Sequence, residues 1–353
     1  MKVAVLGCGN VGIAIASDLS IRKHDVSLIK TSGSPNKSYE LLLKNHKRVY
    51  LKEEAMYTQT IISEVSMNLA SIVNADIVFI TIQSSYHEDL IKNISPYLSP
   101  RQIVVVVCSY MSSMYFRKHC NKLPYLVETT GPYLEGRVEL NDKPGDIVFR
   151  VGCRLTRCPL SIYQSQKQEV LEKLKTAYKG FSNDYNPIES ALLNPNMVIH
   201  TVGSIMSIPR IEYSDGNFCM YREAYSHKNP STLKIMLALD EEKKSVLKAL
   251  GCTPVDIFVA GGFLGDPWES FFRYSESEDR AISPTSVKSR YITEDVSQGL
   301  VLLESIAKRI GVDVPVTSSL ITIASNALGI DFRKTGRTLE KLDSTHFIDS
   351  LKI

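Results

Sequence analysis

The sequence predicts an α/β domain followed by a mainly α-helical domain, and three observations lead to this fold class. The chain has 353 residues, which is more than one ordinary hydrophobic core accommodates. In its first half, apolar runs of strand length alternate with helix-like periodicity, as in a parallel, doubly wound sheet. From about Asn186 onward, long helical patterns replace the strands. We therefore expect one domain in residues 1–185 and a second in residues 186–353.

The composition argues against several classes of protein. Hydrophobic residues make up 44% of the chain and charged residues 22%, as in globular proteins. The net charge of +3 comes from 41 basic and 38 acidic residues spread evenly, which argues against nucleic acid or a membrane surface as a partner. The seven cysteines form no CxxC pair, so we expect reduced thiols and no metal site. The apolar runs are too short to span a membrane, and Met1 leads directly into a strand pattern, which together predict a cytoplasmic protein.

A glycine-rich turn follows the first predicted strand. Val3–Leu6 is apolar, and the sequence Gly-Cys-Gly-Asn-Val-Gly of residues 7–12 leads into a helical pattern. A GxGxxG motif between strand and helix is typical of a Rossmann-type domain, where the glycines let backbone N–H groups approach a pyrophosphate. We therefore predict that the cofactor is bound by Gly7, Gly9, Asn10, Val11 and Gly12.

The end of the second predicted strand indicates which dinucleotide is bound. Val26–Ile29 is followed by Lys30, Thr31 and Ser32, where an Asp or Glu would hold a ribose 2′-hydroxyl. An ammonium group and two hydroxyls could instead bind a 2′-phosphate, so we favour NADP over NAD. NAD remains the alternative if this loop makes no specific contact with the adenine ribose. Gln83, at the carboxyl end of a later strand, completes the predicted cofactor site.

The remaining elements follow from periodicity. In the first half we expect strands at Ala75–Thr81, Ile103–Val107, Leu123–Thr130, Tyr133–Leu140 and Gly145–Val151, the last three extending one sheet, and helices at Tyr39–His46, Glu88–Leu98 and Glu169–Tyr178. In the second half we expect helices at Asn194–Ser207, Ser231–Leu250, Thr293–Ile310 and Val316–Leu328. The cleft between the two domains is the expected place for a substrate.

One helix of the second half has a polar face. Asn194–Pro195 reads as a helix start, and most of the residues that follow are apolar, so the helix should be buried. Asn196, His200, Gly203 and Ser207 are spaced to share one face. This pattern suggests the wall of a cleft. The alternative is a core histidine satisfied by a neighbouring group.

A second informative stretch begins at Arg290. Thr293 can cap a helix, and Asp295 in its first turn would favour the positive end of the helix dipole. Arg290 could equally form a surface ion pair. The aromatic-rich segment from Arg210 to Tyr225 either lines a pocket or closes the domain.

Together these stretches resemble the octopine/nopaline dehydrogenase, or opine dehydrogenase, family. The motifs that match it are the N-terminal Gly-x-Gly-Asn, Glu128–Thr130 with Pro132–Tyr133, Asn194–Asn196 through His200, Arg290–Tyr291 with Glu294–Asp295, and Gly336–Leu342. The resemblance implies a reductive condensation, in which an amino acid and an α-keto acid form an imine that NAD(P)H reduces. It places the catalytic histidine on His200, its aspartate partner on Asp295, the carboxylate-binding arginine on Arg290, and further substrate-binding residues on Asn196, Thr129 and Thr130.

The chemistry suits these residue types. Imine formation needs protons moved to and from the amine and the leaving water, which a histidine titrating near neutral pH can do. Asp295 would fix the tautomer of His200 and favour its cation. The resemblance therefore predicts an oxidoreductase with small-molecule substrates, and leaves open whether it forms a homodimer.

Two alternatives remain open. A ketopantoate reductase or 3-hydroxyacid dehydrogenase would reduce a keto group, but such enzymes usually rely on a lysine, and the helix that holds His200 contains none. An NADPH-sensing protein without catalysis is the other alternative. The turn Cys108–Ser113 also departs from the family, because it lacks the expected Asn and paired Gly at the nicotinamide edge.

Overall fold

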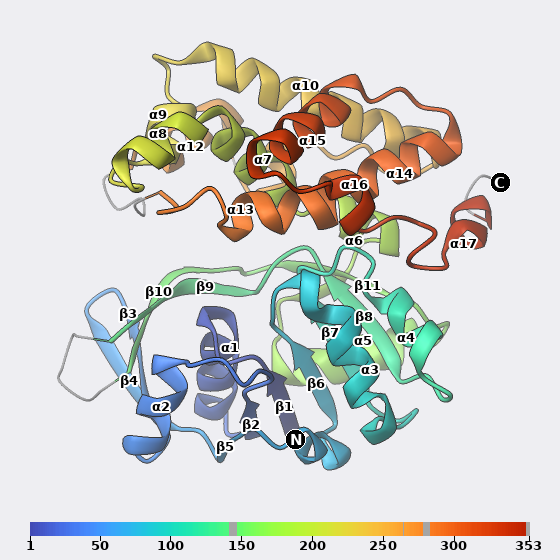
Figure 1. The fold of residues 1–353 in the computed structure, drawn as a ribbon. Coiled ribbons are helices and arrows are strands. Elements are labelled where there is room, and N and C mark those ends of the chain that lie inside the picture. The colour runs from blue at the N-terminus through green and yellow to red at the C-terminus, as the bar shows by residue number, and fades with distance from the viewer. Residues whose placement is uncertain (141–146, 264, 278–282, 351–353) are drawn as a thin grey trace. The chain divides into compact units, whose positions relative to one another are not determined.

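The computed structural model of the chain describes residues 1–140, 147–263, 265–277 and 283–350. The chain divides into two compact units, Met1–Ser190 and Ala191–Ile353. The first is an α/β unit and the second consists of helices (Figure 1), so the predicted fold class is confirmed.

The main sheet of the first unit has eight strands in the order β12-β11-β8-β7-β6-β1-β2-β5. Its central strand β1 pairs in parallel with β2 on one side and with β6 on the other. The order therefore reverses at β1, and ligands of such sheets bind beside the carboxyl ends of the strands at this point. The strands are β1 Lys2–Leu6, β2 Asp25–Ile29, β5 Glu64–Ser66, β6 Ile77–Ile80, β7 Ile103–Val107, β8 Tyr125–Thr129, β11 Cys158–Ile162 and β12 Phe181–Asn183.

Most of this sheet is buried on both faces. Every residue of β6 and β7 is buried, which is why these strands read as unbroken apolar runs. The predicted helices of this unit are present. Its helices are α1 Asn10–Ile21, α2 Lys37–Lys44, α3 His87–Ile94, α4 Ser113–His119, α5 Lys167–Ala177 and α6 Pro187–Leu192, with 3-10 turns η1 Leu69–Asn74, η2 Ser84–Tyr86 and η3 Ser95–Tyr97.

A second sheet in this unit corrects one prediction. β9 (Leu134–Glu139) and β10 (Val148–Arg154) do not extend the main sheet but join β3 (Arg48–Glu53) and β4 (Met56–Ile61) in the order β4-β3-β10-β9. The β3–β4 hairpin was not predicted, because β4 is exposed along its length and shows no apolar face. Helix α1 contacts β9 and β4 as well as β2, so it packs against both sheets. Residues 145 and 146 of the predicted strand lie outside the described residues.

The second unit contains the predicted long helices, with one exception. The expected helix Thr293–Ile310 is three segments: α13 (Arg290–Thr293), a π-helix η4 (Asp295–Leu300) and α14 (Val301–Ile310). Thr293 is not the cap, because its hydroxyl donates back to the Ser289 carbonyl at 3.0 Å. The other helices are α7 Asn196–Met206, α8 Ile208–Ser214, α9 Met220–Ala224, α10 Pro230–Ala249, α11 Ile257–Ala260, α12 Pro267–Glu276, α15 Pro315–Leu328, α16 Phe332–Thr335 and α17 Thr345–Ser350.

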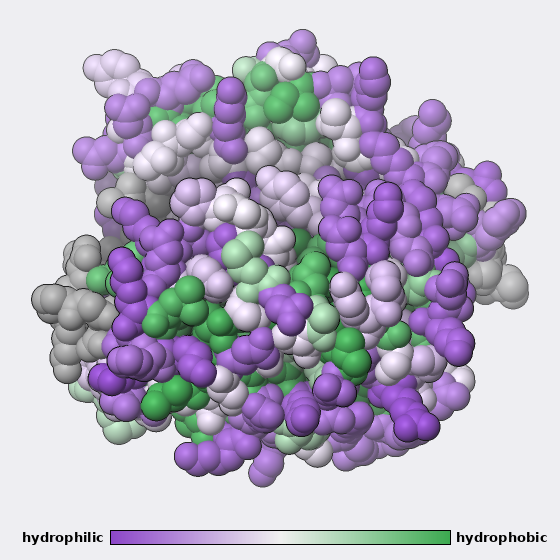
Figure 2. All heavy atoms as spheres, turned by 60° about the horizontal axis from the view of Figure 1, so that its bottom comes forward, coloured by the Kyte–Doolittle hydropathy of each residue, from purple (hydrophilic) through white to green (hydrophobic). Residues whose placement is uncertain are grey.

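The surface contains scattered apolar side chains. On the face drawn in Figure 2, hydrophobic areas are separated by hydrophilic ones. Met56 and Ile61 of β4 and Trp268 of α12 are examples of large exposed side chains. Within the described residues, no helix combines the length and the apolarity that crossing a bilayer requires.

Candidate functional site

The three glycines of the GxGxxG motif each meet a different geometric demand. Gly7 has a φ of +123°, which an L side chain rarely adopts. A Cβ on Gly12 would lie 1.8 Å from the Gly7 carbonyl oxygen, so only glycine allows α1 to approach the turn. A Cβ on Gly9 would meet nothing within 4 Å, which leaves this part of the backbone open to a ligand. This is the division of roles that a dinucleotide pyrophosphate requires.

The N-terminus of α1 can accept an anion. No side chain caps the helix at Gly9, and the first-turn N–H groups of Asn10, Val11 and Gly12 have no carbonyl acceptor within the helix. The Asn10 side chain itself accepts a hydrogen bond from the Val138 N–H at 3.0 Å, which ties the turn to β9. The backbone of these residues, more than the Asn10 side chain, is therefore suited to hold a pyrophosphate.

The segment after β2 has one buried and one exposed lysine. Lys30 is buried, its ammonium donates to the Ser32 carbonyl, and it lies 5.6 Å from the Tyr39 ring centroid. Ser32 and Lys37 are exposed. Lys30 thus anchors the loop from inside, while Lys37 presents its charge to solvent. Gln83 follows the carboxyl end of β6, the strand on the other side of β1, and it is exposed, as a cofactor-binding residue would be.

The turn after β7 has a strained backbone, and a buried carboxylate stabilises it through hydrogen bonds. Cys108, Tyr110 and Met111 have φ values of +55°, +47° and +62°, which are uncommon for residues other than glycine. The fully buried Glu128 carboxylate accepts from the Ser109 hydroxyl and from the Ser113 N–H, both at 2.7 Å. These bonds offset the strain, so the turn keeps a left-handed path without the paired glycines of the family.

A buried histidine that sequence reasoning missed supports the same turn. His87 Nδ1 lies 2.6 Å from the Ser112 hydroxyl, and its Nε2 lies 3.1 Å from the Ile82 carbonyl oxygen. It therefore links the loop after β6 to the loop after β7. Nothing in the sequence pairs His87 with Ser112, because the contact depends on the parallel pairing of these strands.

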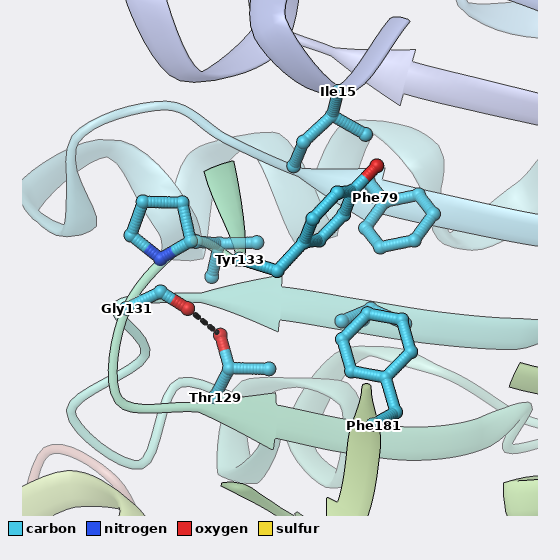
Figure 3. Close-up of a pocket in the computed structure, with 9 residues that line it drawn as sticks. Ile15, Phe79, Thr129, Gly131, Tyr133 and Phe181 are labelled. Atoms are coloured by element: carbon cyan, nitrogen blue, oxygen red, sulfur yellow. Dashed lines mark hydrogen bonds between the residues drawn. The ribbon is translucent and has the colours of Figure 1, made fainter. Parts of the chain in front are cut away.

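Thr129 lies in an apolar part of the first unit. Its hydroxyl donates to the Gly131 carbonyl at 2.8 Å, as Figure 3 shows, and the residue is buried. Tyr133 points into the core toward Phe79, Phe181 and Ile15 (Figure 3), and the space among them is too narrow for a water molecule. The motif thus closes a tight turn, and the half-buried Thr130 is more accessible than Thr129.

In the second unit, the structure brings His200 and Asp295 together. His200 Nδ1 lies 2.8 Å from Asp295 Oδ2, and the two residues are 4% and 1% exposed. The helix that holds His200 begins as predicted, because the Asn194 side chain accepts from the Asn196 N–H at 3.1 Å. Asn196 is half-buried one turn before His200. The buried pair therefore joins two helices that are far apart in sequence.

Asp295 lies where two helical segments meet. It is the first residue of the π-helix η4, which is separated from α13 by the single residue Glu294, and its place in the first turn is the one that the helix-dipole interpretation needs. The Ser297 carbonyl of this segment accepts from the Arg337 N–H at 2.8 Å. Gly336 makes that approach possible, since a Cβ there would lie 2.5 Å from the Ser297 oxygen. π-Helical segments are rare and frequent at functional sites.

Tyrosines surround the histidine. The Tyr291 ring stacks on the His200 ring, with centroids 3.7 Å apart and planes 8° from parallel. The Tyr221 hydroxyl lies 3.0 Å from His200 Nε2. Sequence reasoning assigned no role to either ring, although Tyr221 falls in the aromatic-rich segment and Tyr291 in a quoted motif.

Arg290 lies at the edge of this group. Its side chain is 45% exposed, 3.6 Å from the Glu294 carboxylate, and its guanidinium is 5.7 Å from the Tyr291 ring centroid. The Glu294 side chain is buried at 6% exposure, so only the arginine half of this pair reaches the solvent. Arg290 therefore presents its fork to solvent beside the histidine, where a carboxylate could bind.

The charge state of His200 is set mainly by burial. Burial lowers the pKa of the His200 imidazole below its ordinary value of 6.5, the Asp295 carboxylate raises it, and the Arg290 charge lowers it. The net direction is downward. Asp295 favours the cation as expected, but burial outweighs it, so His200 rests as a neutral base at neutral pH.

The chain is similar to known dehydrogenases in both of its halves. Residues 184–328 match the family described as NAD/NADP octopine/nopaline dehydrogenase, alpha-helical domain, and residues 2–113 match the NAD-dependent glycerol-3-phosphate dehydrogenase N-terminus. The chain is 23% identical to vitopine synthase of Allorhizobium ampelinum, with 97% of this chain and 95% of the relative covered. It is 24% identical to the opine dehydrogenase of an Arthrobacter species, with 96% and 94% covered. The chain is thus opine dehydrogenase-like along its length, and its residues 184–328 match the helical domain of that family.

Solved structures agree with this opine dehydrogenase-like fold. An octopine dehydrogenase with NADH and L-arginine superposes with a TM-score of 0.75 at 16% identity, covering 100% of this chain and 98% of that one. Yersinopine dehydrogenase with NADP+ gives 0.72 at 13% identity, with the same coverage. A ketopantoate reductase from Ralstonia eutropha gives 0.62 at 17% identity, covering 95% and 99%.

The opine dehydrogenase-like chain is thus an NAD(P)-dependent oxidoreductase acting on CH–NH groups, as predicted. The predictions of the family, the enzyme class and a nicotinamide cofactor are confirmed. The preference for NADP over NAD and the roles of single residues stay predictions.

Proposed function

We propose that the protein condenses an amino acid with an α-keto acid and reduces the resulting imine with NAD(P)H. The observation that supports this proposal most strongly is the buried His200–Asp295 pair, whose Nδ1–Oδ2 distance is 2.8 Å. A histidine oriented by a carboxylate can give and take protons at one nitrogen while its tautomer stays fixed. Condensation needs this, because the amine must lose a proton and the departing hydroxyl must gain one.

The residues of the chain divide the remaining work. Neutral His200 takes a proton from the attacking ammonium, and its cation returns a proton to the carbinolamine hydroxyl, which leaves as water. Asp295 holds the Nδ1–H and stabilises the cation while it exists. When bound, the reduced nicotinamide supplies a hydride to the imine carbon.

Substrate and cofactor contacts complete the proposal. Arg290 would bind a carboxylate of the keto acid with its rigid fork, assisted by Asn196 on the same unit. Thr129 and Thr130 remain the candidates on the first unit. We infer that residues 1–185 form the cofactor domain and residues 186–353 the substrate domain. We also infer that the enzyme is cytoplasmic and acts on small-molecule substrates. The predicted cofactor residues are Gly7, Gly9, Asn10, Val11, Gly12, Lys30, Thr31, Ser32 and Gln83.

The test is a grid of α-keto acids against amines, followed by NADPH and NADH absorbance, with mass detection of the product. Similar structures were solved with L-arginine, agmatine and pyruvate, so these compounds are the first to combine. The proposal expects oxidation of the cofactor only when keto acid and amine are both present, and a secondary amine as product.

Two other outcomes would contradict it. Oxidation with a keto acid alone, giving a hydroxy acid, would support the ketopantoate reductase type of reaction, whose fold is similar. Cofactor binding without turnover for any pair would indicate a sensing protein. Among the described residues, α7 contains no lysine to serve the keto-reductase chemistry, which favours condensation.

A further inference from the structure

Both ring nitrogens of His200 already have a partner in the protein. Nδ1 lies 2.8 Å from the Asp295 carboxylate, and Nε2 lies 3.0 Å from the Tyr221 hydroxyl. All three side chains are buried. A proton that leaves or enters His200 therefore has the Tyr221 hydroxyl directly in its path.

The positions of the hydrogens in the hydrogen-bonded series Asp295–His200–Tyr221 follow from the chemistry of these side chains. A carboxylate only accepts, so the hydrogen on the Asp295 side lies on His200 Nδ1. Nε2 of the neutral ring then accepts from the Tyr221 hydroxyl. When the ring is cationic, its Nε2–H donates to the Tyr221 oxygen, and the tyrosine O–H donates to an acceptor other than His200.

We propose that Tyr221 relays the proton between His200 and the reacting substrate; this rests on the proposed condensation. In the dehydration step, the Tyr221 O–H bond breaks and its proton goes to the carbinolamine hydroxyl, which leaves as water. The His200 Nε2–H bond breaks at the same time, and that proton goes to the Tyr221 oxygen. The tyrosine ends unchanged, His200 ends neutral, and the substrate has gained one proton.

The surroundings of Tyr221 hold its hydroxyl in place. Tyr221 forms a hydrogen bond with Tyr274, and their rings meet edge to face with centroids 5.5 Å apart. Burial raises the pKa of the Tyr221 hydroxyl, so the tyrosine stays protonated at rest. The groups facing the pair from other elements are Tyr291, stacked on His200, and Arg290. A neutral hydroxyl wedged between a base and another hydroxyl can pass a proton without carrying a charge for long.

The chain offers a matched control for removing the hydroxyl. Tyr225 lies one turn after Tyr221, is also buried, and donates its hydroxyl to the Ile199 carbonyl of the same helix α7. Tyr221→Phe and Tyr225→Phe each remove one buried hydrogen bond to α7, and Tyr221→Phe also removes the bond to Tyr274, so both should lower stability and Tyr221→Phe should lower it more. Only Tyr221 contacts the proposed proton path.

The experiment measures kcat, KM for keto acid and amine, cofactor affinity and the melting temperature of both variants. We expect Tyr221→Phe to lower kcat by about ten- to a hundredfold, with KM and cofactor affinity within about twofold of wild type. Tyr225→Phe should keep wild-type kcat. As a variant that keeps the hydroxyl and the shape, 3-fluorotyrosine in place of Tyr221 should change the pH profile of kcat, because the more acidic hydroxyl transfers its proton differently.

The outcomes separate this inference from the function on which it rests. If the wild type turns over no keto acid and amine pair, the proposed function fails. If the wild type is active and His200→Gln is inactive, but Tyr221→Phe and the fluorinated protein match the wild type, the function stands and the relay is wrong. Equal losses of kcat in Tyr221→Phe and Tyr225→Phe would also overturn the relay, since packing alone would explain them.

Discussion

At the scale of single residues, His200 combines two opposing environments. Burial favours its neutral form, while Asp295 favours its cation. The result is a lowered pKa together with a partner that stabilises the charge when it appears. Such a residue removes a proton from an amine readily and can still exist briefly as an acid, which condensation requires.

Replacing Asp295 tests this balance. Asp295→Asn removes the charge that raises the pKa of His200, so that pKa should fall further and the acidic limb of the pH–rate profile should move to lower pH. We also expect kcat to fall at least about tenfold. Steady-state rates from pH 4.5 to 9 check this. Glu304→Gln, at an acid paired with Arg333, is the control and should leave the limb in place. An unmoved limb in Asp295→Asn would make Asp295 a purely structural charge.

Arg290 is the residue whose two interpretations differ most in consequence. Arg290→Lys keeps a charge but loses the planar fork, so apparent affinity for the keto acid should weaken by about 1–3 kcal/mol. The exposed Arg210–Glu223 pair provides a control, and Arg210→Lys should leave KM unchanged. If Arg290→Lys changes only the melting temperature, its pairing with Glu294 is the whole of its role.

Sequence reasoning succeeded for some residues and failed for others for physical reasons. The burial and polar face of the helix around His200 follow from spacing alone, so they could be predicted. The stacking of Tyr291 and the Tyr221 bond could not, because they depend on how α9 and α13 pack against α7. The Asp295 partner was available only through the family resemblance, since its local pattern indicated a charge in the first turn of a helix.

At the scale of elements, the π-helix η4 depends on the segment that follows α16. A wider helical turn leaves carbonyls without their usual partners, and the Ser297 carbonyl finds one in the Arg337 N–H at 2.8 Å. Gly336 allows this contact. The C-terminal family motif thus supports the segment that begins with Asp295.

Gly336→Ala should therefore disturb the site from a distance. Its Cβ would lie 2.5 Å from the Ser297 and Phe332 carbonyl oxygens, both backbone atoms that cannot rotate away. We expect a loss of about 1–3 kcal/mol in the free energy of unfolding, together with lower kcat and unchanged cofactor affinity. Urea denaturation and kinetics measure both. Gly152→Ala, whose nearest contact would be an ordinary 3.7 Å, is the control. Wild-type stability in Gly336→Ala would show that the motif packs loosely.

The loop after β2 belongs to the same scale. It lacks the acid that would repel a 2′-phosphate, so we expect NADPH to be preferred over NADH by at least about tenfold, or about 1.4 kcal/mol. Lys30→Met should shrink the preference, because it removes the charge and the anchor on the Ser32 carbonyl. Lys37→Met tests whether the exposed charge contributes separately. Added salt should also weaken the preference. Equal kinetics with NADH in the wild type would mean that the loop leaves the ribose unread.

Elements with a uniform environment were predicted well, and irregular ones were not. The buried strands β1, β6 and β7 read as apolar runs and lie close to their expected ranges. The β3–β4 hairpin was missed because β4 lacks an apolar face. β9 and β10 form a second sheet with this hairpin and do not join the main sheet. The predicted helix Thr293–Ile310 is interrupted by the π-helix at Asp295–Leu300, which no periodicity of 3.6 residues indicates.

At the scale of the whole molecule, several buried or paired charges act on stability with one sign. Burial raises the pKa of Glu304, but hydrogen bonds from Arg333 and Ser318 outweigh it, so the net direction is downward. Glu64 behaves alike, with three serine hydroxyls as donors. The pKa of His200 is also lowered. In each case the group takes up a proton at a higher pH in the unfolded chain than in the folded chain, so acidification favours unfolding.

The folded protein should therefore lose stability on acidification. Stability should be nearly constant between about pH 7 and 8, begin to fall below pH 6.5 as unfolded histidine takes up protons, and fall further below about pH 4.5, where unfolded carboxyls do the same. We expect a total loss on the order of 2 kcal/mol by pH 4, since partly exposed pairs are screened. Urea midpoints at pH 7.5, 6, 5 and 4 measure it. Glu304→Gln should flatten the lower step, and His200→Gln the upper one. Midpoints that rise toward acid would show that groups with raised pKa values in the folded state govern the pH dependence instead.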